Sequence, residues 1–226
     1  MTSHPGKTLG APSVFTRLRT ARLVAVITIE RPDDVQPLCR ALLTGGVSVI
    51  ECALRTPRAL EALTQIKQAF PEVLLGAGTV LTPDQAEKAR QAGADFALAP
   101  GFDAETVRHC AQIALPFIPG VATASEIQAA IALGCRWLKW FPAGPMGGVS
   151  TLRTLAAPFR HLVVSYLPLG GISVDLLKDY LAEPDVGAVG GSWIAPTELV
   201  RLRSWGEIER RASMAAALVQ TGGESL

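Results

Sequence analysis

The feature that most constrains the fold is a repeat along the chain, in which a short apolar run is followed by a longer amphipathic stretch. Apolar runs of this length are typical of buried strands, and the stretches between them have the length of helices. The pattern predicts about eight strands. They are expected at Leu23–Ile27, Val47–Glu51, Val73–Gly78, Phe96–Pro100, Pro116–Pro119, Trp137–Phe141, Leu162–Ser165 and Val186–Val189.

Helix signals stand between these runs. Pro57, Thr82 and Thr123 each introduce an amphipathic stretch, as residues that start helices do. Gly93 and Gly134 follow such stretches shortly before the next apolar run, where glycine readily takes the left-handed conformation that closes a helix. Each predicted strand is therefore followed by a predicted helix.

Strands that alternate with helices predict an α/β protein, here a single (β/α)8 TIM barrel with an additional N-terminal helix. No Ser/Gly/Pro-rich linker divides the chain. An open parallel sheet is the alternative. We expect a flexible N-terminal tail over residues 1–12 and one domain over residues 13–226. The additional helix is expected at Ala11–Thr20 and a long final helix at Pro196–Val219.

Composition and charge exclude several classes of protein. Hydrophobic residues make up 49% of the chain and charged residues 18%, which excludes a disordered chain and a coiled coil. Lys and Arg together number 21 and Asp and Glu 20, and no basic block is present that would neutralise a row of phosphates. We therefore expect no nucleic-acid partner.

The cysteines and the apolar N-terminal stretch bear on location. Cys39, Cys52, Cys110 and Cys135 form no C-x-x-C pair, so a zinc ribbon and a thioredoxin-like motif are excluded. We expect them to be reduced thiols. The stretch Leu23–Ile29 is too short to span a bilayer and lacks a cleavage signal. A cytoplasmic protein without membrane contact is expected.

A lysine stands inside one of the predicted strands. Alternation along Trp137–Phe141 places Lys139 on one face with both aromatic ends, near the strand's carboxyl end, where chemistry gathers in a barrel. Desolvation favours the neutral amine of such a lysine, and a neutral amine can attack a carbonyl carbon. The alternatives are a lysine paired with a carboxylate for structural reasons and one that reaches the rim.

A glutamate is expected opposite this lysine. In Val47–Glu51 the same alternation turns Val47, Val49 and Glu51 to one face. Both strands are even-numbered, and alternate strands fill the same layers of a barrel, so we expect Glu51 to face Lys139. A carboxylate in a dry pocket can be the general acid and base that a lysine nucleophile needs. A purely structural ion pair is the alternative.

Two further polar side chains follow predicted strands. Arg55 carries a fork of donors suited to a carboxylate or a phosphate. Thr79 supplies a hydroxyl after Gly76 and Gly78, glycines that let a ligand approach closely. A surface arginine and a capping threonine are the alternatives.

Glycine pairs follow the last two predicted strands, at Gly170-Gly171 and at Gly190-Gly191-Ser192. The loops after strands seven and eight of TIM barrels frequently bind phosphate through backbone N–H groups. A single Gly-Gly pair is more often a turn, but two at adjoining positions predict a phosphorylated substrate.

Several cofactor classes have no candidate ligands. His4, His109 and His161 lie away from the carboxyl ends of the predicted strands, so a His-based zinc site and a Ser-His-Asp triad have no members. No Gly-x-Gly-x-x-Gly fingerprint with a following acidic residue is present, which disfavours a dinucleotide. We expect no cofactor and no metal, although an all-oxygen magnesium site stays open.

Together these residues resemble the 2-keto-3-deoxy-6-phosphogluconate (KDPG) and KHG aldolase family of pyruvate-dependent class I aldolases. The resemblance runs from about Val24 to Pro196 and is highly specific. Its motifs are Glu51-Cys-Ala-Leu-Arg55-Thr56, Gly76-Ala-Gly-Thr79-Val-Leu, Ala99-Pro100-Gly101, Ile118-Pro-Gly120, Leu138-Lys139-Trp-Phe141-Pro142-Ala143, Gly170-Gly171-Ile172 and Gly190-Gly191-Ser192-Trp193.

The resemblance implies a role for each matching position. Lys139 would form a Schiff base and Glu51 would be the general acid and base. The substrate-binding residues would be Arg55 and Thr79 for the pyruvate carboxylate, Pro100 and Phe141 for the pocket wall, and Gly170, Gly171, Gly191 and Ser192 for the phosphate. It further implies a metal-independent homotrimer of the Entner–Doudoroff pathway. The reaction would reversibly cleave 2-dehydro-3-deoxy-6-phosphogluconate to pyruvate and D-glyceraldehyde 3-phosphate.

Two positions depart from the family's pattern. Its Pro-Thr-Gly-Gly is Pro168-Leu169-Gly170-Gly171 here, and its Pro-Ala-Glu is Pro142-Ala143-Gly144. Leu169 cannot hydrogen-bond a substrate hydroxyl, so a preference for the galactonate-derived C4 epimer is an alternative, as is a smaller substrate such as 4-hydroxy-2-oxoglutarate. The pair Arg55-Thr56 resembles the gluconate-specific members.

Two other functions are compatible with the residues alone. One is a phosphate-binding barrel isomerase or synthase in which Lys139 is only a charge, and no Schiff base forms. The other is a non-catalytic module that binds sugar phosphates. A covalent adduct between pyruvate and Lys139 would distinguish an aldolase from both.

Overall fold

The computed structural model describes residues 12–221. Residues 1–11 of the expected N-terminal tail lie outside this range. The strands are β1 (Leu23–Ile27), β2 (Val49–Ala53), β3 (Leu74–Gly78), β4 (Phe96–Leu98), β5 (Phe117–Ile118), β6 (Gly120–Val121), β7 (Trp137–Trp140), β8 (Ser165–Pro168) and β9 (Val189–Gly191). The α-helices are α1 (Val14–Ala21), α2 (Val35–Thr44), α3 (Ala59–Ala69), α4 (Pro83–Gln91), α5 (Ala104–Gln112), α6 (Ala124–Ala132), α7 (Gly148–Ala156), α8 (Leu177–Leu181), α9 (Thr197–Arg201) and α10 (Trp205–Thr221). Short 3-10 helices are η1 (Pro32–Asp34), η2 (Ala157–Leu162) and η3 (Val174–Leu176).

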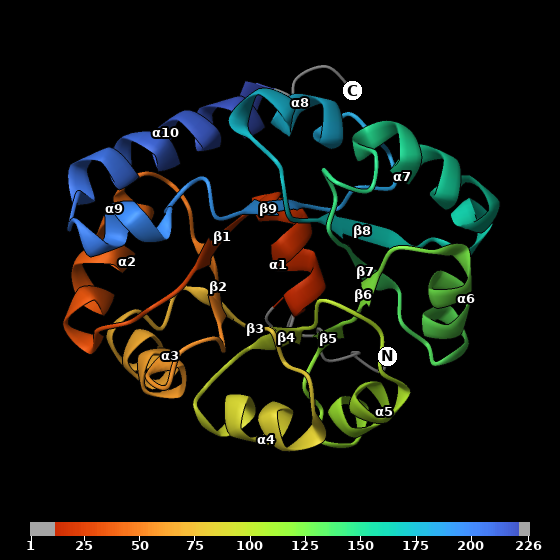
Figure 1. Cartoon of the computed structure of the whole chain (residues 1–226), viewed down its shortest axis with the longest axis horizontal. Helices are drawn as coiled ribbons and strands as arrows, with labels where there is room; N and C mark the ends of the chain where they lie inside the picture. The colour runs from red at the N-terminus through yellow and green to blue at the C-terminus, as the bar shows by residue number, and fades with distance from the viewer. Residues whose placement is uncertain (1–11, 222–226) are drawn as a thin grey trace, which may run out of the picture.

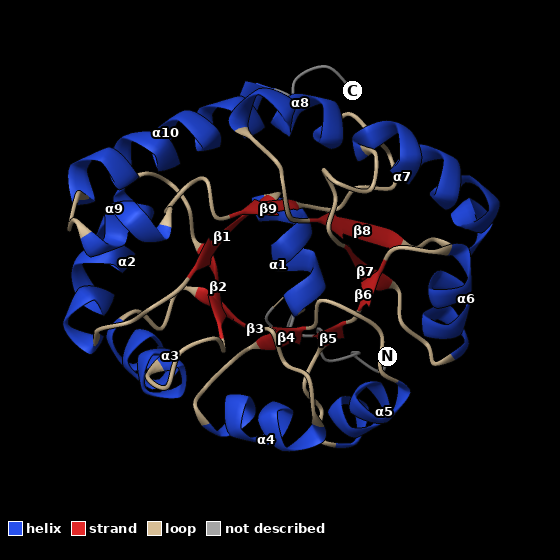
Figure 2. Ribbon diagram, viewed as in Figure 1, coloured by secondary structure: helices blue, strands red, loops and turns tan. Residues whose placement is uncertain are grey.

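The strands form two parallel sheets. A six-stranded sheet has the order β5-β4-β3-β2-β1-β9, and a three-stranded sheet has the order β6-β7-β8. Figures 1 and 2 show the strands curled around a common centre, with the helices other than α1 on the outside. The predicted α/β class is confirmed, with a six-stranded curled sheet as its main part.

The pairing differs from the predicted single ring of eight strands. The strand expected at Pro116–Pro119 is the short β5, and a further strand, β6, follows directly after Pro119, which has no N–H for a ladder. β5 pairs with β4, and β6 pairs with β7. On the other side, Tyr166 of β8 and Val186 form an isolated parallel bridge ahead of β9. The predicted strand over Leu162–Ser165 also begins later than expected, at Ser165.

Both terminal helix predictions can be compared with the structure. The additional N-terminal helix is α1, which lies across the centre of the strands in the view of Figure 1. Phe15 of α1 stacks on Trp137 with 5.7 Å between ring centroids. The prediction of one long final helix is wrong, because α9 and α10 are separate. Arg203 between them has a left-handed φ of 53° and its Nε donates to Asp34 at 3.0 Å.

Alternation along the strands produces two apolar cores. Along β1, Leu23, Ala25 and Ile27 face the helices, whereas Val24 and Val26 belong to an inner cluster enclosed by the strands. The inner cluster includes Trp137. At the carboxyl ends of the strands, buried charged side chains cover this cluster. This arrangement positions the site described next.

Candidate active site

Lys139 lies inside the molecule at the carboxyl end of β7. Within Trp137–Trp140, Trp137 packs in the inner cluster, while Leu138 and Trp140 face the helices. Lys139 therefore points inward, and it is only 5% exposed. Its Nζ stands 5.3 Å from the centroid of the Phe141 ring, at the distance of a cation–π contact. The ammonium is thus held among apolar groups.

Glu51 is the partner of this lysine. It follows Val49 on the inward-facing side of β2, is 1% exposed, and its Oε1 lies 3.1 Å from Lys139 Nζ. Its Oε2 is also buried and has no hydrogen-bond partner among the described residues. One carboxylate oxygen therefore holds the lysine, and the other is left for a group that enters the cavity.

The strand next to β2 makes room for the carboxylate. A Cβ on Gly78 of β3 would stand 2.2 Å from Glu51 Oε1, closer than atoms can approach. Thr79 follows with a φ of 61°, in the left-handed region that non-glycine residues rarely adopt. The bend carries the Thr79 side chain to the same cavity as Glu51. Glycine at 78 is therefore required by the site.

These side chains share one cavity of about 230 Å³ at the carboxyl ends of the strands. Of the ten residues singled out in the sequence, nine line it and Gly171 does not. Val26 and Leu169 line it as well. Val26 was missed, although its place at the inward end of β1 is the same signal that located Glu51. The lining residues are Val26, Glu51, Arg55, Thr79, Pro100, Lys139, Phe141, Leu169, Gly170, Gly191 and Ser192.

Arg55 reaches the cavity from the loop after β2. Its side chain is exposed, and its Nη2 donates to Thr28 Oγ1 at 3.3 Å. Thr56 anchors the same loop, because its Oγ1 donates to the Ile29 carbonyl at 2.6 Å. The guanidinium is thus held at the rim with donors left for an anion.

Phe141 and Pro100 form an apolar part of the wall. The peptide bond between Phe141 and Pro142 is cis. A Cβ on Gly120 would stand 2.2 Å from the Pro100 carbonyl, so glycine permits the chain after β5 to approach this wall. The apolar wall lies beside the buried amine and keeps water from it.

Glycines after β8 shape another part of the rim, beside Phe141. Gly170 and Gly171 have left-handed φ values of 88° and 74°. A Cβ on Gly144 would lie 2.6 Å from the Gly171 carbonyl oxygen, so the glycine at this departure from the family pattern permits close packing of the two loops. Gly171 is exposed, and Gly170 and Gly191 are the glycines that line the cavity.

The other reactive groups near the site are unsuited to catalysis. Burial raises the pKa of the Cys52 thiol to about 12, and the adjacent Glu51 charge adds to the effect. The thiol is therefore protonated at neutral pH and a poor nucleophile.

Within residues 12–221 there is no group of three or more His, Cys, Asp or Glu that could hold a metal ion. None of the described helices is both long and apolar enough to cross a membrane.

The fold and the cavity define a parallel α/β protein with a lysine-centred pocket, in which a buried amine is held by a carboxylate. Comparison with known proteins identifies the family. A family model described as KDPG and KHG aldolase matches residues 14–211. The chain therefore belongs to the KDPG and KHG aldolase family.

Individual relatives agree over most of the chain. It is 42% identical to the 2-dehydro-3-deoxy-phosphogluconate aldolase of Treponema pallidum, over 87% of this chain and 92% of the relative. It is 40% identical to that of Pseudomonas aeruginosa, over 87% and 89%. A crystal structure of KDPG aldolase from Legionella pneumophila, with pyruvate captured as a covalent carbinolamine, has a TM-score of 0.86 and 36% identity, covering 90% of this chain and 98% of that one.

Proposed function

We propose that this chain is a class I aldolase that reversibly cleaves 2-dehydro-3-deoxy-6-phosphogluconate to pyruvate and D-glyceraldehyde 3-phosphate. The observation that carries the proposal is the buried contact of 3.1 Å between Lys139 and Glu51 inside the cavity. Membership of the family and the names of the relatives support the same substrate. Pyruvate bound covalently in the Legionella protein supports a lysine nucleophile.

The reaction begins when Glu51 takes a proton from the Lys139 ammonium that it contacts, and the neutral amine attacks the C2 carbonyl carbon of the substrate. The resulting carbinolamine loses water with a proton from Glu51, which leaves a protonated imine. Glu51 then takes the proton of the C4 hydroxyl, directly or through a water molecule. The C3–C4 bond breaks, its electron pair enters the imine to form an enamine, and glyceraldehyde 3-phosphate leaves.

The second half of the reaction returns the lysine. The enamine is protonated at C3, with Glu51 as the proton donor, and regains the imine. Water adds to C2, the carbinolamine collapses, and pyruvate leaves the free Lys139 amine. The unpartnered Oε2 of Glu51 is the atom from which these protons would move.

The remaining cavity residues would bind the two ends of the substrate. Arg55 and Thr79 would hold the carboxylate, and Pro100 and Phe141 would form the wall around the pyruvate carbons, because all four line the cavity. Gly170, Gly191 and Ser192 also line the cavity and would bind the phosphate, with the Gly171 N–H from the rim. A Zymomonas mobilis KDPG aldolase, 35% identical, has been solved with 3-phosphoglycerate, which supports a site for phosphorylated ligands.

Trapping with borohydride tests the proposal. Pyruvate and sodium borohydride should attach a 1-carboxyethyl group to the Lys139 amine, seen as a mass increase on the peptide that carries it. Lys139→Met should take up no label there, and Lys88, which is exposed on α4, serves as an internal control. An unlabelled Lys139 in an enzyme that is turning over would refute the Schiff base.

A second substrate has specific support. The Escherichia coli relative named KHG/KDPG aldolase is 37% identical over 86% of this chain. We therefore propose that 4-hydroxy-2-oxoglutarate, which retains the C2 ketone and the C4 hydroxyl, is cleaved by the same Lys139 chemistry. A coupled assay for pyruvate release with this substrate tests it, and the absence of pyruvate would exclude it.

We also propose that residues 13–226 form one domain built on a closed (β/α)8 barrel. The Lys139 N–H donates to the Pro119 carbonyl at 2.8 Å, which continues pairing past the interruption between β5 and β6. The bridge between Tyr166 and Val186 supports closure on the other side. Closure can be measured by hydrogen exchange of the Lys139 N–H and of the backbone N–H groups at the bridge between Tyr166 and Val186. Slow exchange at both places is expected, and rapid exchange at both would contradict closure.

The resemblance to the family further supports a homotrimer, which we propose for this chain together with a cytoplasmic location. Cys39, Cys52, Cys110 and Cys135 are all free thiols in the structure, as suits a reducing compartment. Light scattering after size-exclusion chromatography would give the mass of the assembly. A monomer at working concentration would contradict the trimer.

A further inference from the structure

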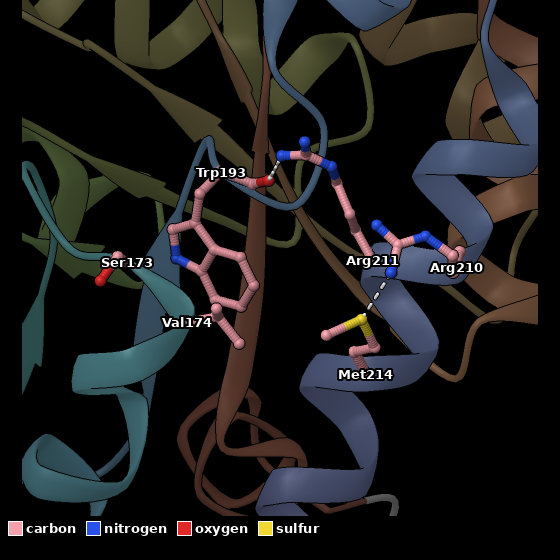
Figure 3. A pocket seen from close by; sticks show the side chains of 6 residues that line it. All are labelled: Ser173, Val174, Trp193, Arg210, Arg211 and Met214. Atoms are coloured by element: carbon pink, nitrogen blue, oxygen red, sulfur yellow. Dashed lines mark hydrogen bonds between the residues drawn. The ribbon is translucent and has the colours of Figure 1, made fainter.

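A second cavity lies outside the candidate active site. It has a volume of about 280 Å³, and none of its lining residues lines the catalytic cavity. It is formed between the segment that leads into α8 and the helix α10, as Figure 3 shows. It is slightly smaller than the range of about 300–1,000 Å³ usual for ligand pockets, so a small ligand would fit. The lining residues are Ser173, Val174, Trp193, Arg210, Arg211 and Met214.

The polar side of this cavity carries excess positive charge. Arg210 Nε donates to Glu207 Oε2 at 2.7 Å, and Arg211 Nε donates to Glu207 Oε1 at 2.8 Å. Two guanidinium groups thus share one carboxylate. The Arg210 side chain is 58% exposed. A site of this charge favours an anion, and guanidinium groups match the geometry of carboxylates and phosphates.

The other side of the cavity is apolar. The indole of Trp193 lies beside Val174, with Met214 on the α10 side (Figure 3). The Trp193 N–H is buried and has no hydrogen-bond partner among the described residues. Its carbonyl accepts from Arg211 Nη1 at 3.1 Å, so the arginine and the indole are joined at the same cavity. A flat apolar group would pack against this wall.

The cavity shares a loop with the catalytic site. A Cβ on Gly191 would stand 2.3 Å from both Cδ1 and Nε1 of Trp193, so the indole lies directly against this glycine. Gly191 and the next residue, Ser192, line the catalytic cavity. The indole therefore touches both this cavity and a glycine of the catalytic cavity.

We propose that this cavity binds a small organic anion, made of a flat apolar body and one carboxylate or phosphate group. The two arginines would hold the anionic group, while Trp193, Val174 and Met214 hold the body. The site is separate from the proposed aldolase reaction and does not depend on it.

Benzoate is the probe, because it combines a flat ring with a carboxylate. Titration of the full chain should give saturable quenching of tryptophan fluorescence. Benzyl alcohol, a neutral molecule of similar shape, should bind much more weakly. Phenyl phosphate replaces benzoate in a parallel titration, and the tighter of the two identifies the preferred anionic group. Equal binding of benzoate and benzyl alcohol would overturn the proposal.

Variants locate the binding. Loss of a charge-assisted hydrogen bond in Arg210→Gln should weaken benzoate about tenfold. Arg90→Gln is the matched control, because Arg90 also pairs with a glutamate three residues before it, in α4. Arg55→Gln tests for binding in the catalytic cavity instead. The proposal fails if Arg210→Gln binds as Arg90→Gln does, or if Arg55→Gln alone abolishes binding.

Discussion

Lys139 and Glu51 are two charged side chains held out of water, and each is the salt-bridge partner of the other. Glu51→Gln keeps the shape of the side chain but removes its ability to accept and return protons. We expect kcat to fall by about 10²–10⁴-fold, the contribution typical of a general acid or base. Steady-state assays of pyruvate release measure it.

The control for this variant is a buried carboxylate elsewhere. Glu183 is 7% exposed and pairs with Arg153, away from the cavity. Glu183→Gln should lose stability and retain the catalytic constants. If the two variants lost activity equally, the effect at Glu51 would be one of folding, and the proposed proton transfer would be contradicted.

Thr28 is expected to affect substrate binding by positioning Arg55. Its hydroxyl accepts a hydrogen bond of 3.3 Å from Arg55 Nη2 and helps to hold the guanidinium at the rim. Thr28→Val should raise KM for the substrate about 2- to 10-fold, because it removes one long, exposed hydrogen bond to the guanidinium, and leave kcat nearly unchanged. Thr154→Val, which removes an exposed hydroxyl of α7, is the control. A fall in kcat at constant KM would contradict a positioning role.

Leu169 bears on discrimination between substrates. Its side chain is 3% exposed and lines the cavity, where it offers no hydrogen bond to a hydroxyl. We expect weak preference between the two C4 epimers of the substrate, and about a 2- to 10-fold stronger preference in Leu169→Thr. The ratio of kcat/KM for the two epimers measures it. A ratio unchanged by this substitution would show that recognition of the C4 hydroxyl lies elsewhere.

At the scale of an element, β3 is shaped for its neighbour. A Cβ at Gly78 would collide with Glu51 Oε1, whereas one at Gly206 in α10 would meet no atom within 4 Å. Gly78→Ala should therefore displace the carboxylate and abolish most activity. Gly206→Ala should keep activity and change the free energy of unfolding by about 1 kcal/mol or less. Equal behaviour of the two variants would contradict the collision.

The elements also show what the sequence could predict. The two-residue period of a strand was sufficient to place Glu51 and Lys139 on inward faces, because each run is apolar and bounded by clear signals. The same period did not show that a second short strand, β6, would follow Pro119, since that strand forms by pairing with β7. The break at Arg203 was missed for a similar reason: Asp34, which binds it, is distant in sequence.

At the scale of the whole molecule, buried thiols link stability to pH. Burial raises the pKa of Cys39, Cys52 and Cys110 from 9.0 to about 12. Above pH 9.0 the unfolded chain releases these protons while the native protein retains them, so rising pH favours unfolding. Three such groups should lower the free energy of unfolding by roughly 4 kcal/mol per pH unit. This stability is fully present at neutral pH.

Urea denaturation between about pH 8 and about pH 11 measures this slope. Lysines and tyrosines titrate in the same range, so the comparison is between the protein and its variant Cys110→Ala. The variant loses core packing at every pH, but its free energy of unfolding should fall less steeply with pH, by about 1.4 kcal/mol per unit. Parallel curves for the two proteins would mean that the native Cys110 thiol ionises as it does in water, and that the buried cores admit solvent.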